Sequence, residues 1–525
     1  MPTLGQRLAK ALAARGVTTL FGIPGVHNVE LYRGIEAAGL SHVLARHEQG
    51  AGFMADGYAR VTGQPGVALV ISGPGLTNIM TPMAQAWSDS VPMLVISATL
   101  EARDRGARIG RLHDMPDQEG AARAASGQSF TASTPAMLWD QLEAAFASFA
   151  QARPGPVHIQ IPLDVLAAEA GPAPAPRPLP RRPGADAVAL SDAARMIAAA
   201  KRPLMVLGGG AWSGAEGLSA LSERASIPLF TTYAARGIAA PDHPMWLGAT
   251  LARARAAEVF ARADLVIAIG TELAETDLWR AHPGHDCPMI RVDIDPAQLS
   301  ARHRADLAIC ADAGAFAGAL DMPDESRSAW TQKEVRAWRD NLTASAMQER
   351  PEPARVIPHL TEALTPRSCV VSDMTGLAYL GKEVVPLPQG ARWHHPFGFG
   401  TLGYGLPAAI GAKVADPARE VICIAGDYGL QYTIQELGTA VELGLGLPIL
   451  LWDNAKLGEI EVAMQTAQMP PIAIAAQNPD FVALARAYGA AGCELARLRD
   501  LGAVLRDAFA ADRPMLIRIT PETPE

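Results

Sequence analysis

The 525-residue sequence has few of the features that mark several large protein classes. Its five cysteines lie far apart and none belongs to a Cys-x-x-Cys pair, so neither a zinc site nor a disulfide framework is expected. No apolar run approaches the ~18 residues of a membrane-spanning helix, and the N-terminal stretch lacks the apolar core of a signal peptide. Basic residues form no run longer than Arg181–Arg182 and the net charge is -9, which disfavours nucleic-acid binding. We therefore expect a cytoplasmic protein with no membrane and no nucleic-acid partner.

Short aliphatic runs, by contrast, recur along the whole chain, and hydrophobic residues make up 49% of it. The runs cover residues 67–72, 92–97, 157–161, 204–207, 265–269, 290–294, 369–372, 421–425 and 448–452. Unbroken Val/Ile/Leu runs of this length are typical of parallel strands that are buried on both faces. Because helical patterns separate them, the sequence predicts an α/β protein with doubly wound, mostly parallel sheets. Its length predicts about three domains.

Two breaks divide the chain. Residues 171–184, GPAPAPRPLPRRPG, hold six prolines and predict an extended linker. A second break, from about 321 to 353, contains a charged helical pattern. We expect an N-terminal domain (1–170), a Pro-rich linker (171–185), a middle domain (186–322), a linker helix (323–352) and a C-terminal domain (353–525).

The sharpest pattern lies in the third segment. The run 421–425 leads into Gly426-Asp427-Tyr428-Gly429, and the run 448–452 leads into Asp453-Asn454. One strand–helix–strand unit separates the two, so both motifs should lie at the carboxyl ends of neighbouring parallel strands, where ligands bind. Carboxylate and amide oxygens suit Mg²⁺, with phosphate oxygens completing the shell. Taken alone, each motif would indicate a turn after a strand, but the spacing and the strand context together favour the ligand site.

These motifs resemble the signature of the thiamine-diphosphate-dependent enzymes, the family that includes acetolactate synthase, benzoylformate decarboxylase and pyruvate decarboxylase. The signature is Gly-Asp-Gly followed by Asn-Asn, so Tyr428 and Asp453 are departures. The resemblance implies the cofactor thiamine diphosphate with Mg²⁺. The implied Mg²⁺ ligands are Asp427, Asn454 and the backbone carbonyl of Lys456. Cofactor contacts are implied for Gly426, Asp427, Tyr428, Gly429, Asn454 and Leu457.

Further upstream, the run 400–411, GTLGYGLPAAIG, is also similar to the family. The resemblance implies that Leu402 supports the bent cofactor, that Gly400 offers it a carbonyl, and that Thr375 and Gly376 contact the diphosphate. The alternative for the run 400–411 is a glycine-rich segment that leads into a core helix.

The first segment holds RHEQGA (46–51) and ADGYAR (55–60), which match the family's activating motif without departure. By resemblance, Glu48 is the catalytic carboxyl group beside the pyrimidine, where it promotes formation of the C2 ylide. A helix N-terminal glutamate is the structural alternative. In the family the pyrimidine and the diphosphate contact different subunits. The resemblance therefore implies a homodimer or homotetramer with active sites at the subunit interface.

Substrate-side candidates follow from loops that correspond to pocket loops of relatives. His27 and His113 are candidate acid–base residues, and Val26, Gly73 and Glu459 are candidate substrate contacts; each could instead be an ordinary loop or capping residue. The middle segment has glycine turns after strands but no GxGxxG motif, so FAD is not expected.

These similarities imply decarboxylation of a 2-oxo acid to an aldehyde. Residues 29–34, 110–113 and 116–118 resemble the 5-guanidino-2-oxopentanoate decarboxylase branch. A guanidinium group would pair with carboxylates; candidates are Glu272, Glu275, Asp277, Glu459 and Glu461, which could equally form a solvated rim. An acetolactate synthase, in which the enamine attacks a second 2-oxo acid, is the alternative. A non-catalytic cofactor-binding protein is the second alternative.

Overall fold

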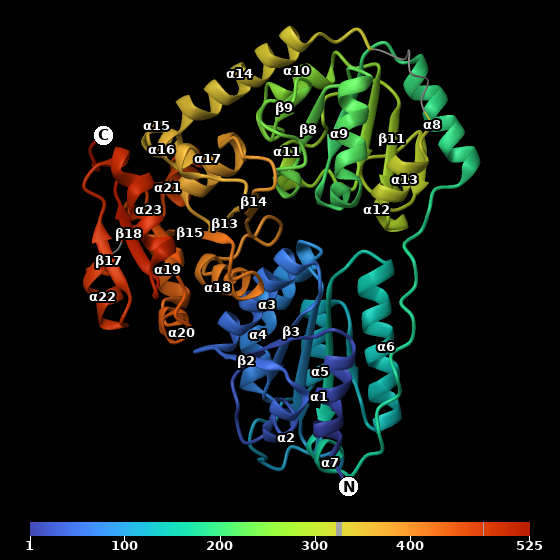
Figure 1. Cartoon of the computed structure of the whole chain (residues 1–525), viewed down its shortest axis with the longest axis vertical. Coiled ribbons are helices and arrows are strands. Elements are labelled where there is room, and N and C mark those ends of the chain that lie inside the picture. Colours follow the sequence, from blue (N-terminus) through green and yellow to red (C-terminus); the bar gives the residue numbers. More distant parts are fainter. Residues whose placement is uncertain (322–327, 476) are drawn as a thin grey trace.

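The computed structural model describes residues 1–321, 328–475 and 477–525, and within these ranges the strands form three parallel sheets of six strands each (Figure 1). Helices flank each sheet, which confirms the predicted α/β class with doubly wound sheets. We call the parts around the three sheets the first lobe (α1 to α7), the middle lobe (α8 to α13) and the third lobe (α14 to β18). Residue 322 and the first part of the predicted linker helix, 323–327, lie outside the described residues.

The first lobe contains the sheet β2-β1-β3-β4-β6-β5. Its strands are β1 (Thr19–Gly22), β2 (Ser41–Leu44), β3 (Gly66–Val70), β4 (Met93–Thr99), β5 (Ser129–Thr131) and β6 (Pro156–Pro162). Its helices are α1 (Leu4–Ala14), α2 (Val29–Tyr32), η1 (Glu36–Ala38), α3 (Glu48–Thr62), α4 (Pro74–Ser88), α5 (Gln118–Ser126), α6 (Pro135–Gln151) and α7 (Leu163–Ala167). The strands β3, β4 and β6 are buried at every residue, as their aliphatic sequences predict.

The middle lobe contains the sheet β12-β11-β10-β7-β8-β9. Its strands are β7 (Pro203–Leu207), β8 (Leu229–Thr231), β9 (Trp246–Gly248), β10 (Leu265–Ile269), β11 (Met289–Asp293) and β12 (Leu307–Cys310). Its helices are α8 (Ala187–Ala199), η2 (Gly209–Gly214), α9 (Ala215–Arg224), η3 (Tyr233–Ala235), α10 (Ala256–Phe260), α11 (Glu275–Leu278), α12 (Pro296–Leu299) and α13 (Ala313–Ala319). The proline-rich residues 171–186, all described, form neither helix nor strand between α7 and α8.

The third lobe contains the sheet β14-β13-β15-β16-β18-β17. Its strands are β13 (Ser368–Ser372), β14 (Arg392–His394), β15 (Glu420–Gly426), β16 (Pro448–Trp452), β17 (Ala491–Glu494) and β18 (Met515–Ile519). Its helices are α14 (Gln332–Glu349), α15 (Pro351–Ala354), α16 (Val356–Ala363), α17 (Gly376–Val384), α18 (Gly405–Ala415), α19 (Asp427–Thr433), α20 (Glu436–Glu442), α21 (Gly458–Thr466), α22 (Phe481–Ala487), η4 (Leu498–Asp500) and α23 (Leu501–Ala510).

The first and third lobes share one hydrophobic core, although the middle lobe separates them in the sequence. The core runs from β1 and β3 through α3 and α18 to β13 and β15 (Figure 1). The two helices meet at glycines: a Cβ atom at Gly57 would lie 1.9 Å from the carbonyl oxygen of Ala408, and one at Gly411 would lie 1.9 Å from that of Met54. The sequence folds this way because only glycine lets the two backbones approach so closely.

A buried polar network reinforces the same contact. Asp56 on α3 accepts hydrogen bonds from the Tyr404 hydroxyl (2.6 Å) and from the guanidinium of Arg60 (2.6 Å). Arg60 also pairs with Asp89 at 2.7 Å, and Asp89 accepts the backbone N–H of Gly398 at 2.8 Å. Both acids are therefore paired with a cation, as buried charges require, and they join the two lobes.

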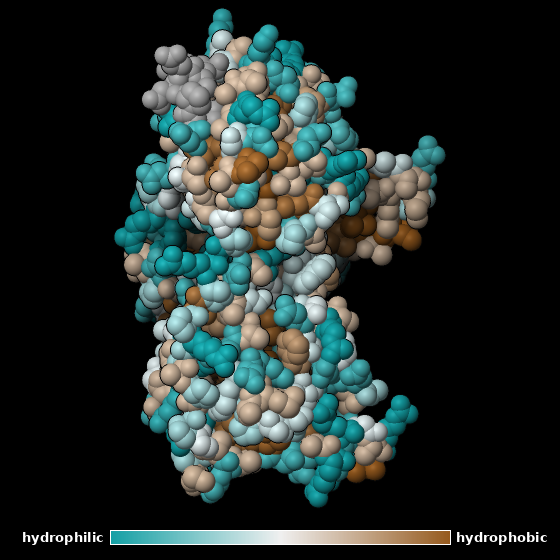
Figure 2. Space-filling model, turned by 90° about the vertical axis from the view of Figure 1, so that its right-hand side faces the viewer, coloured by the Kyte–Doolittle hydropathy of each residue, from teal (hydrophilic) through white to brown (hydrophobic). Residues whose placement is uncertain are grey.

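On the face shown in Figure 2, hydrophilic and hydrophobic residues are interspersed, and the surface narrows between the lower part of the molecule and the upper part. Among the helices of the described residues, none combines the length and the apolar character needed to cross a membrane.

Candidate functional site

Two polar segments meet at the carboxyl ends of β13 and β15, which are neighbours in the third sheet. A Cβ atom at Gly426 would lie 2.8 Å from the hydroxyl oxygen of Thr375, so the two strand ends are in contact. The helix α17 begins at Gly376, and the Thr375 side chain makes no capping hydrogen bond to it. Its first N–H groups are thus available to an anion, which the dipole of the helix also favours.

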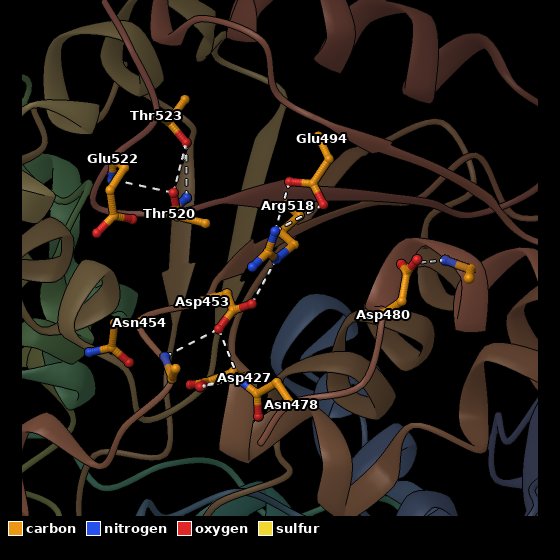
Figure 3. Close-up of polar contacts among 12 residues, drawn as sticks. Asp427, Asp453, Asn454, Asn478, Asp480, Glu494, Arg518, Thr520, Glu522 and Thr523 are labelled. Carbon is orange, nitrogen blue, oxygen red and sulfur yellow. Dashed lines mark hydrogen bonds and ion pairs between the residues drawn. The ribbon is translucent and has the colours of Figure 1, made fainter. Parts of the chain in front are cut away.

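Asp427 lies at the same edge of the sheet, with 3% of its surface exposed. Its carboxylate accepts a hydrogen bond from the Asn478 side chain (2.7 Å), and among the described residues it forms no ion pair (Figure 3). Burial raises the pKa of Asp427, the Asn478 hydrogen bond lowers it, and the nearby Asp453 raises it again. A divalent cation would stabilise this carboxylate, so the predicted Mg²⁺ ligand fits its role.

The other two predicted metal ligands follow β16. Asn454 accepts the backbone N–H of Lys456 through its side-chain oxygen at 3.4 Å. Between them Ala455 has φ +55°, a left-handed conformation that turns the chain sharply and is unfavourable for a residue with a side chain. Within the described ranges, no three His, Cys, Asp or Glu side chains converge as a metal-binding cluster. A cation here would therefore take oxygens from Asp427, Asn454, the Lys456 carbonyl and a diphosphate.

The remaining predicted cofactor contacts, Tyr428, Gly429 and Leu457, lie around the same edge of the sheet. A Cβ atom at Gly429 would lie 2.8 Å from the carboxyl carbon of Asp373. The Tyr428 hydroxyl donates to the carbonyl of Ile474 at 3.5 Å, and the backbone N–H of Leu457 donates to the same carbonyl at 2.8 Å. The segment after Asn454 is thus folded back against the start of α19.

Asp373, which the sequence did not single out, organises the loop that carries Leu402. Its carboxylate accepts the backbone N–H groups of Gly403 (3.3 Å) and Gly405 (3.0 Å). Burial raises the pKa of Asp373 to about 6, although these donors lower it. Gly400 has φ +67°, and Leu402 is half-buried. The loop that should support the cofactor is therefore held by a buried acid at the end of β13.

Glu48 begins α3 and is 8% exposed. Its Oε2 atom accepts a hydrogen bond from the Asn78 side chain at 2.9 Å. The preceding backbone N–H groups of Arg46 and His47 donate to Glu436 of α20, at 3.1 and 3.0 Å. Among the residues the structure describes, no hydrogen bond or ion pair links Glu48 to the metal-site residues.

The turn at Ser72 and Gly73 and the start of α4 bring the three predicted catalytic residues together. Ser72 is hydrogen-bonded to Nδ1 of His27 at 2.6 Å. Gly73 has φ +63°, and a Cβ atom there would lie only 2.7 Å from the carbonyl oxygen of His113, so no side chain fits at this position. At Gly75 the same test atom lies 3.5 Å from Glu48 Oε1. Gly73 thus allows His113 to approach the turn closely, and Glu48 lies beside the start of α4.

His27 and His113 form a pair. Their ring centroids lie 4.8 Å apart at 69°, and burial together with His113 lowers the pKa of His27. His113 has φ +63°, and its Nδ1 atom is buried without a hydrogen-bond partner in the described structure. Val26 is 71% exposed beside them. Two imidazole rings in contact can hold or pass a proton at this position.

A cavity of about 190 Å³ adjoins His113. It is lined by Thr99, Leu100, Arg105, Gly106, His113, Asp114, Met115, Pro116, Asp117, Gln118 and Gln160. Gln118 connects the cavity with the turn at Gly73, since its side chain accepts the Gly73 N–H at 2.9 Å and donates to Gln160 at 2.8 Å. The carboxylate of Asp114 forms no ion pair with any described residue.

Three of the acidic residues that the sequence suggested for a cationic substrate are already paired with cations of the chain. Glu272 is paired with Arg153, Glu459 with Arg350, and Glu461 with Lys456 at 2.7 Å. Glu275 is exposed, and burial raises the pKa of Asp277 to about 7 despite the nearby Lys382. The three paired acids would have to exchange an internal cation for a substrate.

Comparisons with known proteins agree with this arrangement. Three family models match the chain: "Thiamine pyrophosphate enzyme, N-terminal TPP binding domain" over residues 2–125, "central domain" over 190–320 and "C-terminal TPP binding domain" over 375–519. A probable 2-ketoarginine decarboxylase of Pseudomonas aeruginosa is 44% identical, covering 98% of this chain and 94% of the relative. Acetolactate synthase isozyme 2 large subunit of Escherichia coli is 31% identical over 98% and 95%. A probable acetolactate synthase large subunit of Methanocaldococcus jannaschii is 31% identical over 99% and 92%.

Proposed function

The chain belongs to the thiamine pyrophosphate enzyme family, and on that premise we propose that it is a Mg²⁺-dependent decarboxylase that converts a 2-oxo acid into an aldehyde and carbon dioxide. The observation that carries the proposal is Asp427, a buried carboxylate without a cation partner among the described residues, next to the free N-terminus of α17. Such an edge suits a metal ion that bridges the protein and a diphosphate. Bound thiamine diphosphate supplies the electron sink that makes loss of carbon dioxide possible.

The chain's own residues divide the remaining work. Asn78 occupies Oε2 of Glu48 and fixes the plane of its carboxyl group, which leaves Oε1 to hold a proton against the pyrimidine ring. His27 and His113, the pair beside Ser72 and Gly73, would supply a proton to the product carbon after carbon dioxide leaves. Asp373 holds the backbone of the Leu402 loop and keeps it in place.

We also propose that two copies of the chain form each active site. Glu48 and Asp427 are held by separate networks within one chain. The segment after Asn454 exposes large apolar side chains, with Ile460 46%, Val462 58% and Ile472 64% exposed. Exposed apolar groups of this kind are typical of protein interfaces. A homodimer, or a homotetramer built from dimers, would cover them and place Glu48 of one chain beside Asp427 of another.

For the substrate we propose a 2-oxo acid with a cationic side chain, 5-guanidino-2-oxopentanoate. The relative from Pseudomonas aeruginosa is named for 2-ketoarginine, and the cavity beside His113 offers the unpaired carboxylate of Asp114. Carboxylates at the cavity, Asp114 and Asp117, outnumber its one arginine, Arg105. A guanidinium group forms charge-assisted hydrogen bonds with such a carboxylate.

A product and specificity screen tests these statements. Purified protein with Mg²⁺ and thiamine diphosphate should release an aldehyde from 5-guanidino-2-oxopentanoate with a higher kcat/KM than from pyruvate. Asp114→Asn should lower kcat/KM for the guanidino acid ~10- to 150-fold, as expected for a hydrogen bond to a charged group of 1.5–3 kcal/mol. Glu459→Gln is the matched comparison, because Glu459 already pairs with Arg350. A loss confined to Glu459→Gln would move the cation site there.

The alternative is an acetolactate synthase-type carboligase, which the 31% identical relatives favour. It differs in the acceptor, since a second 2-oxo acid replaces the proton after decarboxylation. If pyruvate is the better substrate and acetolactate accumulates, this alternative replaces the decarboxylase. A non-catalytic cofactor-binding protein would show Mg²⁺-dependent cofactor binding and no turnover with any 2-oxo acid in the panel.

A further inference from the structure

A single side chain, Asn478, joins the two carboxylates at the carboxyl ends of β15 and β16 (Figure 3). Its amide nitrogen Nδ2 donates to Asp427 Oδ2 at 2.7 Å and to Asp453 Oδ1 at 2.8 Å. An amide nitrogen has two hydrogens, so one goes to each carboxylate. The amide oxygen accepts a hydrogen bond from the Gln431 side chain at 3.4 Å. The donor capacity of Asn478 is therefore fully used in holding these two acids together.

The two carboxylates differ in their charge partners. Asp453 Oδ2 is paired with Nε of Arg518 at 2.7 Å, and Arg518 in turn binds both oxygens of Glu494 at 2.9 Å through Nη1. Asp427 has no such cation among the described residues. The extra negative charge of Asp453, at a position where the family signature has asparagine, is thus compensated within the sheet by β18, and Asp427 remains the carboxylate for a metal ion.

Described residues on both sides of Asn478 make contacts that hold them in place. After it, Asp480 caps α22 by accepting the N–H of Ala483 at 2.9 Å. Before it, Ala475 forms an antiparallel bridge with Lys456, whose carbonyl is an expected metal ligand, and Ile474 accepts the Leu457 N–H. The amide of Asn478 is therefore placed by α22 and by the segment that follows Asn454.

From this geometry we propose that Asn478 is a positioning residue for the cation site: it holds Asp427 in place against the like charge of Asp453, which Arg518 neutralises. The inference rests on the proposed Mg²⁺-dependent cofactor binding. Asparagine at position 453 would carry no like charge beside Asp427, so the need for Asn478 arises from the aspartate that stands there in this chain. Partners that orient a metal ligand typically change metal affinity ~10–100-fold when they are removed.

A double-mutant cycle tests the proposal. Mg²⁺ is titrated into full-length protein with thiamine diphosphate at fixed concentration, and binding is followed by calorimetry, which does not depend on turnover. Asn478→Ala should weaken Mg²⁺ binding ~10-fold or more. In the Asp453→Asn background, Asn478→Ala should change the Mg²⁺ affinity by less than about a third of the fold-change seen in the wild-type background. Gln477→Ala, an exposed neighbour, is the matched control and should bind as wild type does.

The outcomes separate the inference from the function on which it rests. Wild-type protein that binds no thiamine diphosphate with Mg²⁺ refutes both. Wild-type binding that is unchanged in Asn478→Ala refutes the positioning role alone, and so does an equal loss in the Asp453 and Asp453→Asn backgrounds. If Asn478→Ala does not fold, Asn478→Ser, which keeps one donor hydrogen, replaces it and should give a smaller loss that Asp453→Asn again removes.

Discussion

The contact between α3 and α18 allows a quantitative prediction, because Gly57 has no room for even one methyl group. In Gly57→Ala the new Cβ atom would lie 1.9 Å from the carbonyl oxygen of Ala408, which is backbone and cannot rotate away. The helices must separate, and overpacking of this kind costs ~1–3 kcal/mol or more. Alanine in a helix regains up to ~1 kcal/mol over glycine, so we expect a net loss of about 1–2 kcal/mol.

Thermal unfolding of the purified protein measures this loss. For a unit that comprises the first and third lobes, ~1 kcal/mol corresponds to a fall of about 1–2 °C in Tm. Gly217→Ala in α9 is the matched control, since its Cβ would meet only the Ala317 side chain at an ordinary 3.4 Å. We expect no loss there. A Tm for Gly57→Ala at or above that of wild type would show that the two helices are not locked as described.

Three further predictions concern the site and the pH dependence of stability. Glu48→Gln should retain Mg²⁺-dependent cofactor binding by calorimetry and lose ~10²–10⁴-fold in turnover; activity within about twofold of wild type would remove Glu48 from the mechanism. Asp427→Ala and Asn454→Ala should each abolish Mg²⁺-dependent binding of thiamine diphosphate, and unchanged affinity in both would place the metal elsewhere. Burial lowers the pKa of His158 from 6.5 to about 3, so the unfolded chain binds a proton that the folded one does not. Stability should therefore fall by up to ~1.4 kcal/mol per pH unit below pH ~6.5, and His158→Gln should flatten that slope in urea unfolding.

The central strands could be predicted from the sequence because each is an aliphatic run buried on both faces. The runs at 265–269 and 448–452 coincide with β10 and β16. Each of the other predicted runs begins and ends within two residues of the strand that it predicted. The strands that escaped prediction are short or interrupted. β8, β9 and β14 have three residues each. β18 has the sequence MLIRI, in which Arg518 interrupts the aliphatic run and pairs with Asp453.

For the site, sequence motifs predicted Glu48, Asp427 and Asn454 but not the side chains that contact Glu48 and Asp427. Asn78 and Asn478 each donate to a carboxylate that is far away along the chain. Such partners are set by tertiary folding and leave no local pattern. The ion pairs of Glu272 and Glu459 with arginines from other segments could not be foreseen for the same reason.

The shared core of the first and third lobes has a consequence for how the chain can be rearranged. These lobes are held together by interlocked helices and by the network of Asp56, Arg60 and Asp89, whereas the backbone connects them only through the middle lobe. In topological terms the middle lobe is an insert between the two halves of this body, and it contacts α17 through Tyr233 and Arg236, which hydrogen-bond to Glu383 and to the carbonyl of Gly381. Redesign of the insert therefore has to keep these contacts with α17, whereas substitutions between α3 and α18 should displace the helix that begins at Glu48 and the loop that carries Leu402.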